Sequence, residues 1–234
     1  MIFNEVERAL GLLEEAESRI AEMQTSTTGT IRIGASDTIF EYFLADKIVE
    51  YHERFPAVNF ELTADLTPAT IEKLKADKCD VAFVNLPLEP DPELTLYGNC
   101  MRLNDVFIVG EKYKKLCEKT ISLSELQKYP LVLMDGNTIA RQAINSFFSS
   151  LGVQLKPSIE VESWDLMKGL VERGMGIGII PREYAVRRLE TGTLFELKTD
   201  PVLPARSVGM LLLKNAPVPY ALHAFIEEFK KENR

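Results

Sequence analysis

The sequence predicts a two-lobed α/β fold. From residue 30 onward, segments with strand character alternate with segments with helix character. This alternation occurs in two series, of about 75 and 100 residues, with a junction near Asn104. Alternating strands and helices indicate βαβ units and a largely parallel sheet in each series.

Residues 2–24 precede the alternation and predict an amphipathic helix. Apolar side chains recur there at a spacing of three or four residues: Phe3, Val6, Leu10, Leu13 and Ile20. A stripe this narrow is typical of a helix that pairs with another helix. Packing of the helix against its own domain is the alternative, and the polar tract 25–29, which predicts a short linker, argues against it.

The first series begins directly after this linker. Pro56 closes its first helix, and the alternating pattern after Val58 is that of a half-buried strand. The predicted strands are 30–35, 58–64, 79–84, 94–101 and 106–109, and the predicted helices are 39–55 and 68–76.

The second series continues the same pattern. Its predicted strands are 131–134, 158–161, 177–180, 194–197 and 208–213, and its predicted helices are 139–151, 164–172, 182–190 and 217–230. The last helix has one apolar face. The final strand and helix could return to the first lobe, which would give two crossovers and a hinge, but composition alone does not show that return.

Composition restricts the partners. The formal net charge is −8, so this chain lacks the basic surface of a nucleic-acid binder and should not bind DNA by itself. It has no apolar run long enough to span a membrane, and its first residues do not form a signal peptide. Three scattered cysteines, Cys79, Cys100 and Cys117, fit a reducing cytoplasm and predict buried structural thiols, with a redox pair or metal site as the alternative.

Candidate binding residues follow the strands, because ligands of parallel α/β sheets sit beyond the carboxyl ends of the strands. Short polar side chains stand at these points: Ser36, Thr38, Thr67, Asn85, Asn137, Thr138 and Ser163. Each precedes a helix or could do so, and helix starts suit an anionic ligand. The alternative is that they only cap helices, as in the capping box from Thr38 to Glu41 or the step from Thr67 to Pro68. Arg141, one turn inside a helix, could pair with a ligand carboxylate or form a surface salt bridge.

Catalytic, metal and cofactor motifs are absent from the sequence. The glycines between Gly174 and Gly178 imitate a dinucleotide fingerprint, but they close a helix and lead into a strand, which is the reverse of what that motif requires. We therefore expect no enzyme activity, no cofactor and no metal ion.

Four segments together resemble the linker helix and effector-binding domain of LysR-type transcriptional regulators. They are GTIRIGAS at 29–36, FPAV at 55–58, LKADKCDVAF at 74–83 and LVERGMGIGIIP at 170–181. The order and spacing of the four are specific, and the resemblance covers essentially the whole chain. Ala45 stands where the family usually has Pro, and Asp77 where it usually has Gly.

The resemblance implies a fold like the type 2 periplasmic binding proteins, with two lobes, two hinge crossovers and a preceding linker helix. The implied ranges are 1–28 for the linker and dimerisation helix, 29–103 with 212–234 for lobe I, and 104–211 for lobe II. It also implies effector contacts at Thr38, Thr67, Asn137 and Thr138.

The implied function is that of a cytoplasmic sensor that binds a small effector, expected to be anionic, between its lobes. It would act as a homodimer or homotetramer and reach DNA only through a winged helix-turn-helix domain that this chain lacks, so the chain is expected to be part of a longer protein. Two alternatives share the scaffold: an extracytoplasmic solute-binding protein of a transporter, and an enzyme.

Overall fold

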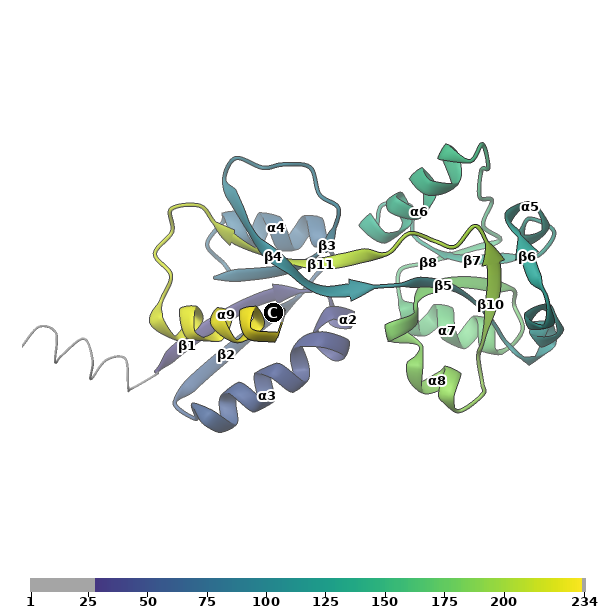
Figure 1. Cartoon of the computed structure of the whole chain (residues 1–234). Coiled ribbons are helices and arrows are strands. Elements are labelled where there is room, and N and C mark those ends of the chain that lie inside the picture. Colours follow the sequence, from purple (N-terminus) through teal and green to yellow (C-terminus); the bar gives the residue numbers. More distant parts are fainter. Residues whose placement is uncertain (1–27, 233–234) are drawn as a thin grey trace, which may run out of the picture.

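The computed structural model describes residues 28–232, which form two lobes joined by two extended connections (Figure 1). The predicted helix over residues 2–24 lies outside the described residues. Each lobe contains one β-sheet with helices packed against it. No helix among residues 28–232 is both long enough and apolar enough to cross a membrane.

The first lobe is built on a five-stranded sheet of order β2-β1-β3-β11-β4. Strand β1 runs parallel to β2 and β3, whereas β11 runs antiparallel to β3 and β4. The strands are β1 (Gly29–Ala35), β2 (Val58–Ala64), β3 (Val81–Leu86), β4 (Leu94–Leu103) and β11 (Arg206–Leu213). The last strand and the last helix, α9 (Tyr220–Glu232), therefore return to the first lobe, as the resemblance implied.

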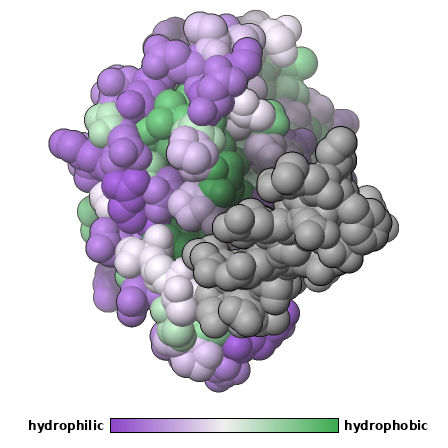
Figure 2. All heavy atoms as spheres, turned by 90° about the vertical axis from the view of Figure 1, so that its left-hand side faces the viewer, coloured by the Kyte–Doolittle hydropathy of each residue, from purple (hydrophilic) through white to green (hydrophobic). Residues whose placement is uncertain are grey.

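Helices cover both faces of this sheet. Strand alternation sends Ile31, Ile33 and Phe83 to one face, where they join Phe225 of α9 in the larger core. Cys79 lies against the opposite face, in a smaller core with residues of α4 (Thr67–Lys75). Seen from the end of this lobe, the visible surface is mostly hydrophilic, and its most hydrophobic residues show near the centre of the view (Figure 2).

The second lobe contains a six-stranded sheet of order β6-β10-β5-β9-β7-β8. Its strands are β5 (Asp105–Val109), β6 (Thr120–Ser122), β7 (Leu131–Met134), β8 (Ile159–Val161), β9 (Ile177–Pro181) and β10 (Phe195–Asp200). Its helices are η2 (Glu111–Glu118), α5 (Leu123–Leu126), α6 (Ile139–Ser150), α7 (Trp164–Glu172), η3 (Arg182–Tyr184) and α8 (Val186–Glu190). The sequence pattern predicted no element at η2, β6 or α5, which are short or contribute no buried residue to the core.

The helix predicted over residues 39–55 is divided. It begins as α2 (Asp37–Ile39), passes through the π-helical turn η1 (Phe40–Leu44), and continues as α3 (Ala45–Arg54). π-helical turns are rare, and those that occur inside α-helices are frequently found at functional sites. This one leaves no hydrophobic pattern of its own in the sequence.

The two connections between the lobes lie together. Strand β4 leads into β5, and β10 leads back into β11 (Figure 1). Because β11 starts at Arg206, it joins the first sheet before the predicted lobe boundary at residue 212, and the lobe boundaries themselves stay a prediction.

The backbone conformation at Asp77 explains why the family usually has Gly at this position. Its φ of 54° lies in the left-handed region that favours glycine. Aspartate tolerates this conformation better than most residues, and the Asp77 carboxylate also pairs with the Arg32 guanidinium at 2.8 Å.

Candidate functional site

A cavity of about 350 Å³ lies between the two lobes. The first lobe contributes Ser36, Asp37, Thr38, Glu41, Tyr42, Ala64, Asp65, Leu66, Thr67, Pro68 and Asn85. The second lobe contributes Met134, Thr138, Ile139, Ala140, Glu162, Ser163, Trp164 and Asp165. A ligand in this cavity would contact both lobes at once.

Several helices begin at the wall of this cavity. Ser36 caps the helical segment that starts at Asp37, Thr138 caps α6, and Ser163 caps α7, each by accepting a backbone N–H with its hydroxyl oxygen. The start of α4 also lies there, and its N-terminus carries no side-chain cap. Helix N-termini present unpaired N–H groups and partial positive charge, so the cavity can hold an anionic group.

Six of the eight predicted binding residues line the cavity: Ser36, Thr38, Thr67, Asn85, Thr138 and Ser163. The other two, Asn137 and Arg141, are not among the lining residues. Asn137 is exposed on the loop before α6. That the six bind an effector stays a prediction.

Arg141 is buried, and its guanidinium is bonded within the second lobe. Its guanidinium donates to the carbonyl oxygen of Met134 at 2.7 Å and to the carboxylate of Glu160 at 2.9 Å, and a third bond reaches Asn145. These bonds fasten α6 to its own sheet. They satisfy the guanidinium within the second lobe, so the geometry does not support a bond from Arg141 to a ligand.

The capping roles predicted for Thr38 and Thr67 are wrong. Ser36 occupies the cap position, and Thr38 lies inside α2. Leu66 is the residue at the cap position of α4, while the hydroxyl oxygen of Thr67 accepts a bond from the backbone N–H of Asn85 at 3.3 Å. Both threonines line the cavity without serving as helix caps.

Asn85 connects the cavity to the crossing strands. Its side-chain oxygen accepts a hydrogen bond from Arg206 at 3.2 Å. Arg206 also forms a bidentate pair with Asp105, at 2.5 and 2.9 Å, and both side chains are almost fully buried. Because Arg206 begins β11 and Asp105 begins β5, this pair ties the two connections together beside the cavity.

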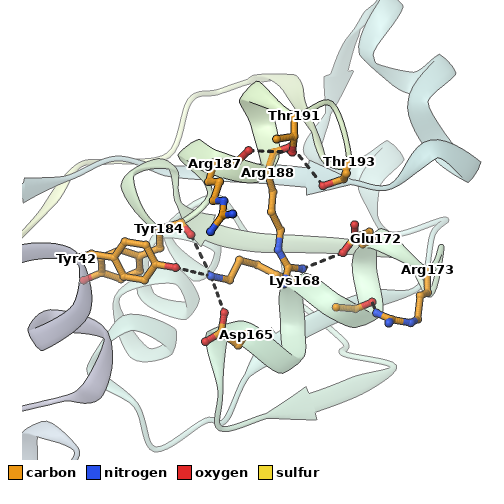
Figure 3. Close-up of polar contacts among 11 residues, drawn as sticks. Tyr42, Asp165, Lys168, Glu172, Arg173, Tyr184, Arg187, Arg188, Thr191 and Thr193 are labelled. Atoms are coloured by element: carbon orange, nitrogen blue, oxygen red, sulfur yellow. Dashed lines mark hydrogen bonds and ion pairs between the residues drawn. The ribbon is translucent and has the colours of Figure 1, made fainter.

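Lys168 links the lobes at another edge of the cavity (Figure 3). Its ammonium group, on α7, donates to the Tyr42 hydroxyl of the first lobe at 2.7 Å and to the Tyr184 carbonyl at 3.2 Å. The Asp165 carboxylate, 2.8 Å away, balances the charge. The Tyr184 hydroxyl is buried and has no hydrogen-bond partner among the described residues, and burial raises its pKa above the usual value.

Sequence reasoning missed the aromatic and acidic walls of the cavity. Tyr42 follows Thr38 by one helical turn, and Trp164 follows Ser163 directly, so proximity to the predicted residues was an available signal. Asp and Glu on helix faces are usually exposed to solvent, so the acidic residues by themselves gave no signal of a cavity wall.

The cysteines and acidic groups offer no metal centre within residues 28–232, where no cluster of three or more His, Cys, Asp or Glu side chains is placed to hold an ion. Cys79 is buried, and burial raises the pKa of its thiol to about 11. Cys100 and Cys117 are half-buried free thiols.

Comparisons with known proteins agree with this geometry. The family model described as LysR substrate binding domain matches residues 24–234. Among curated proteins, the chain is 26% identical over 202 residues to the HTH-type transcriptional regulator CysB of Burkholderia cenocepacia, covering 83% of this chain and 64% of that protein. It is 24% identical over 234 residues to the probable RuBisCO transcriptional regulator of Trichormus variabilis, covering 97% of this chain and 69% of that protein. The chain thus spans about two thirds of the length of these relatives.

Solved structures share the fold. The effector-binding domain of QuiR in complex with shikimate superposes with a TM-score of 0.77 at 22% identity, over 88% of this chain and 97% of that domain. The CcmR regulatory domain of Synechocystis PCC6803 in complex with 2-PG gives a TM-score of 0.79 at 17% identity, over 88% and 98%. The curated relatives are named as transcriptional regulators, so neither the transporter nor the enzyme alternative is supported.

Proposed function

Because this chain belongs to the LysR substrate-binding domain family, the effector-binding part of transcriptional regulators, we propose that it senses a small molecule in the cavity between its lobes. The proposal rests on one observation: helix N-termini and hydroxyl side chains from both lobes line the same cavity. The QuiR and CcmR domains, solved with shikimate and with 2-PG, support an effector that carries an acidic group.

The effector would act by changing how the lobes are held together. A ligand that contacts both lobes stabilises the lobe arrangement to which it binds more tightly, and only that difference in affinity shifts the population. Moving an equilibrium from about 1:99 to 99:1 requires a preference of about 10⁴-fold. The bonds of Lys168 and Arg206, which lie between the lobes, are the contacts that such a change would alter.

The longer protein would control transcription in the cytoplasm through a DNA-binding domain outside this chain. Residues 1–28 would form the linker and dimerisation helix of a homodimer or homotetramer. Sedimentation of the chain with and without residues 1–24 tests the pairing, and an unchanged profile would contradict it. The acidic chain alone should not shift duplex DNA at physiological salt.

Effector binding is tested by thermal shift against small organic acids, amino acids and inorganic anions. Thr67→Val and Thr38→Val should weaken binding of any stabilising compound by more than they lower the melting temperature, because both side chains line the cavity. Thr120→Val, on β6 and not among the lining residues, is the control. Full binding by both cavity variants would contradict the proposed site.

A further inference from the structure

The charge of the cavity wall is strongly one-sided. Among the residues that the structure describes, its lining contains no lysine or arginine but five carboxylates. Asp65 is paired with Lys73 at 2.5 Å, and Asp165 with Lys168 at 2.8 Å. The other three carboxylates, on Asp37, Glu41 and Glu162, accept no hydrogen bond and form no ion pair within residues 28–232.

The three unpaired carboxylates come from both lobes. Asp37 and Glu41 lie on the helical segment of the first lobe, and Glu162 lies between β8 and α7 of the second. All three are solvent-exposed. A ligand that is only an anion would be repelled by this part of the wall, since like charges brought together raise the free energy of binding.

The more buried part of the wall has the opposite hydrogen-bonding character. Arginine can only donate, so the side-chain oxygen of Asn85 must face Arg206, which leaves the Asn85 NH₂ group free to donate elsewhere. The hydroxyl oxygen of Thr67 already accepts from the Asn85 backbone, so its proton is also free to donate. Thr67 is only 7% exposed, and Arg206 is also 7% exposed, which fixes these donors in place.

We propose that the effector is a zwitterion. Its acidic group binds the donors of Thr67 and Asn85, and an ammonium group lies against Asp37, Glu41 and Glu162. This inference rests on the proposed function of the cavity and specifies the chemical class of its ligand. A cationic group turns the repulsion of three carboxylates into charge-assisted hydrogen bonds, whereas Lys168 contributes little to the balance because its ammonium is buried and already paired with Asp165.

The test compares matched pairs of ligands on the whole chain. Each of the amino acids and short ω-amino acids is titrated beside the carboxylic acid with the same carbon skeleton and no amine, by thermal shift and then calorimetry. At least one amino acid should bind about tenfold more tightly than its deaminated partner, which is the difference that two or three exposed ion pairs provide. Stabilisation only by acids that lack an amine, or none by any zwitterion, would overturn the inference.

Variants of the cavity carboxylates test whether these residues bind the ammonium group of the ligand. Asp37→Asn combined with Glu162→Gln should weaken binding of the amino acid about three- to tenfold and leave binding of the deaminated acid unchanged or tighter. Glu196→Gln, which removes an exposed carboxylate that is paired with Arg182 in the second lobe, should change neither affinity. Equal effects of the double variant on both ligands would refute an ammonium site.

The two proposals fail differently. If acids without an amine bind at least as tightly as the amino acids, and Thr67→Val weakens that binding, the cavity is an effector site but the zwitterion inference is wrong. If no small molecule of any charge stabilises the chain, both are wrong.

Discussion

Replacing Asp105 by Asn should strongly destabilise the chain, because it leaves the Arg206 guanidinium buried without its counter-charge. The side chains of Arg206 and Asp105 are 4% and 2% exposed, and two hydrogen bonds join them. Removing one partner of a buried ion pair costs about 3–5 kcal/mol. Asparagine keeps the volume and one acceptor oxygen, so we expect the lower end, about 3 kcal/mol. For a chain of this size that corresponds to a fall in melting temperature of about 6–12 °C.

Scanning calorimetry measures this change, with two further variants beside it. Glu196→Gln breaks an exposed pair with Arg182, whose side chains are 39% and 56% exposed, and should cost less than about 1 kcal/mol. Adding Arg206→Met to Asp105→Asn should recover part of the loss, because the uncompensated charge is removed. A loss from Asp105→Asn no larger than that from Glu196→Gln would refute the idea that the buried pair fastens the two connections.

Three other predictions concern stability and reactivity. Gly176→Ala would place a Cβ against the backbone oxygen of Pro130 and should lower the melting temperature by about 2–12 °C. Gly136→Ala meets nothing within 4 Å and should be nearly neutral, as thermal unfolding will show. Tyr184→Phe removes a buried hydroxyl without a described partner and should be neutral or stabilising. Tyr51→Phe removes the buried hydrogen bond to the carbonyl oxygen of Ala221, 2.9 Å long, and should cost about 1 kcal/mol of unfolding free energy in urea. A larger loss from Tyr184→Phe than from Tyr51→Phe would contradict these hydrogen-bond roles. Burial raises the pKa of the Cys79 thiol from about 9 in the unfolded chain to about 11 in the folded protein. Its contribution to stability is therefore present below pH 9 and is lost between about pH 9 and 11. Cys79→Ala should make the alkaline decline in melting temperature shallower, as melting curves between about pH 8 and 11 will show.

The fold was largely predictable, because strands and helices differ in the spacing of their apolar residues: every second residue in a strand, every third or fourth in a helix. The apolar strands around Ile31, Phe83 and Ile179 and the amphipathic helices near them gave the order of elements, and the structure confirms a two-sheet α/β architecture. The π-helical turn at Phe40–Leu44 was missed because it lies inside a segment with an ordinary helical pattern. The 3₁₀ helix at Glu111–Glu118 was missed because it is mostly polar and none of its residues is buried.

For the candidate site, the sequence predicted only which residues directly follow the carboxyl ends of strands, where ligands of parallel sheets bind. That rule placed Thr67 and Thr138 correctly at the cavity but did not show where each side chain points, and Arg141 turns into its own lobe. It also gave no information on Lys168 or Arg206, whose partners lie 126 and 101 residues away in the chain. Such distant pairings depend on the assembled lobes, and a single sequence does not encode them in any local pattern.

The position of β11 sets an order of events during synthesis. Within the part of the chain that the structure describes, β4 is joined to its sheet only through β11, which is formed by residues Arg206–Leu213. The described strands of the second sheet are all encoded by Asp200, before β11 begins at Arg206, so that sheet can be completed while the first sheet still has an open edge at β3. Since domains fold as units during translation, the lobe encoded second is expected to be finished first. A nascent chain arrested between the two stages would expose the edge of β3, which makes this interval the one in which a chaperone is most useful.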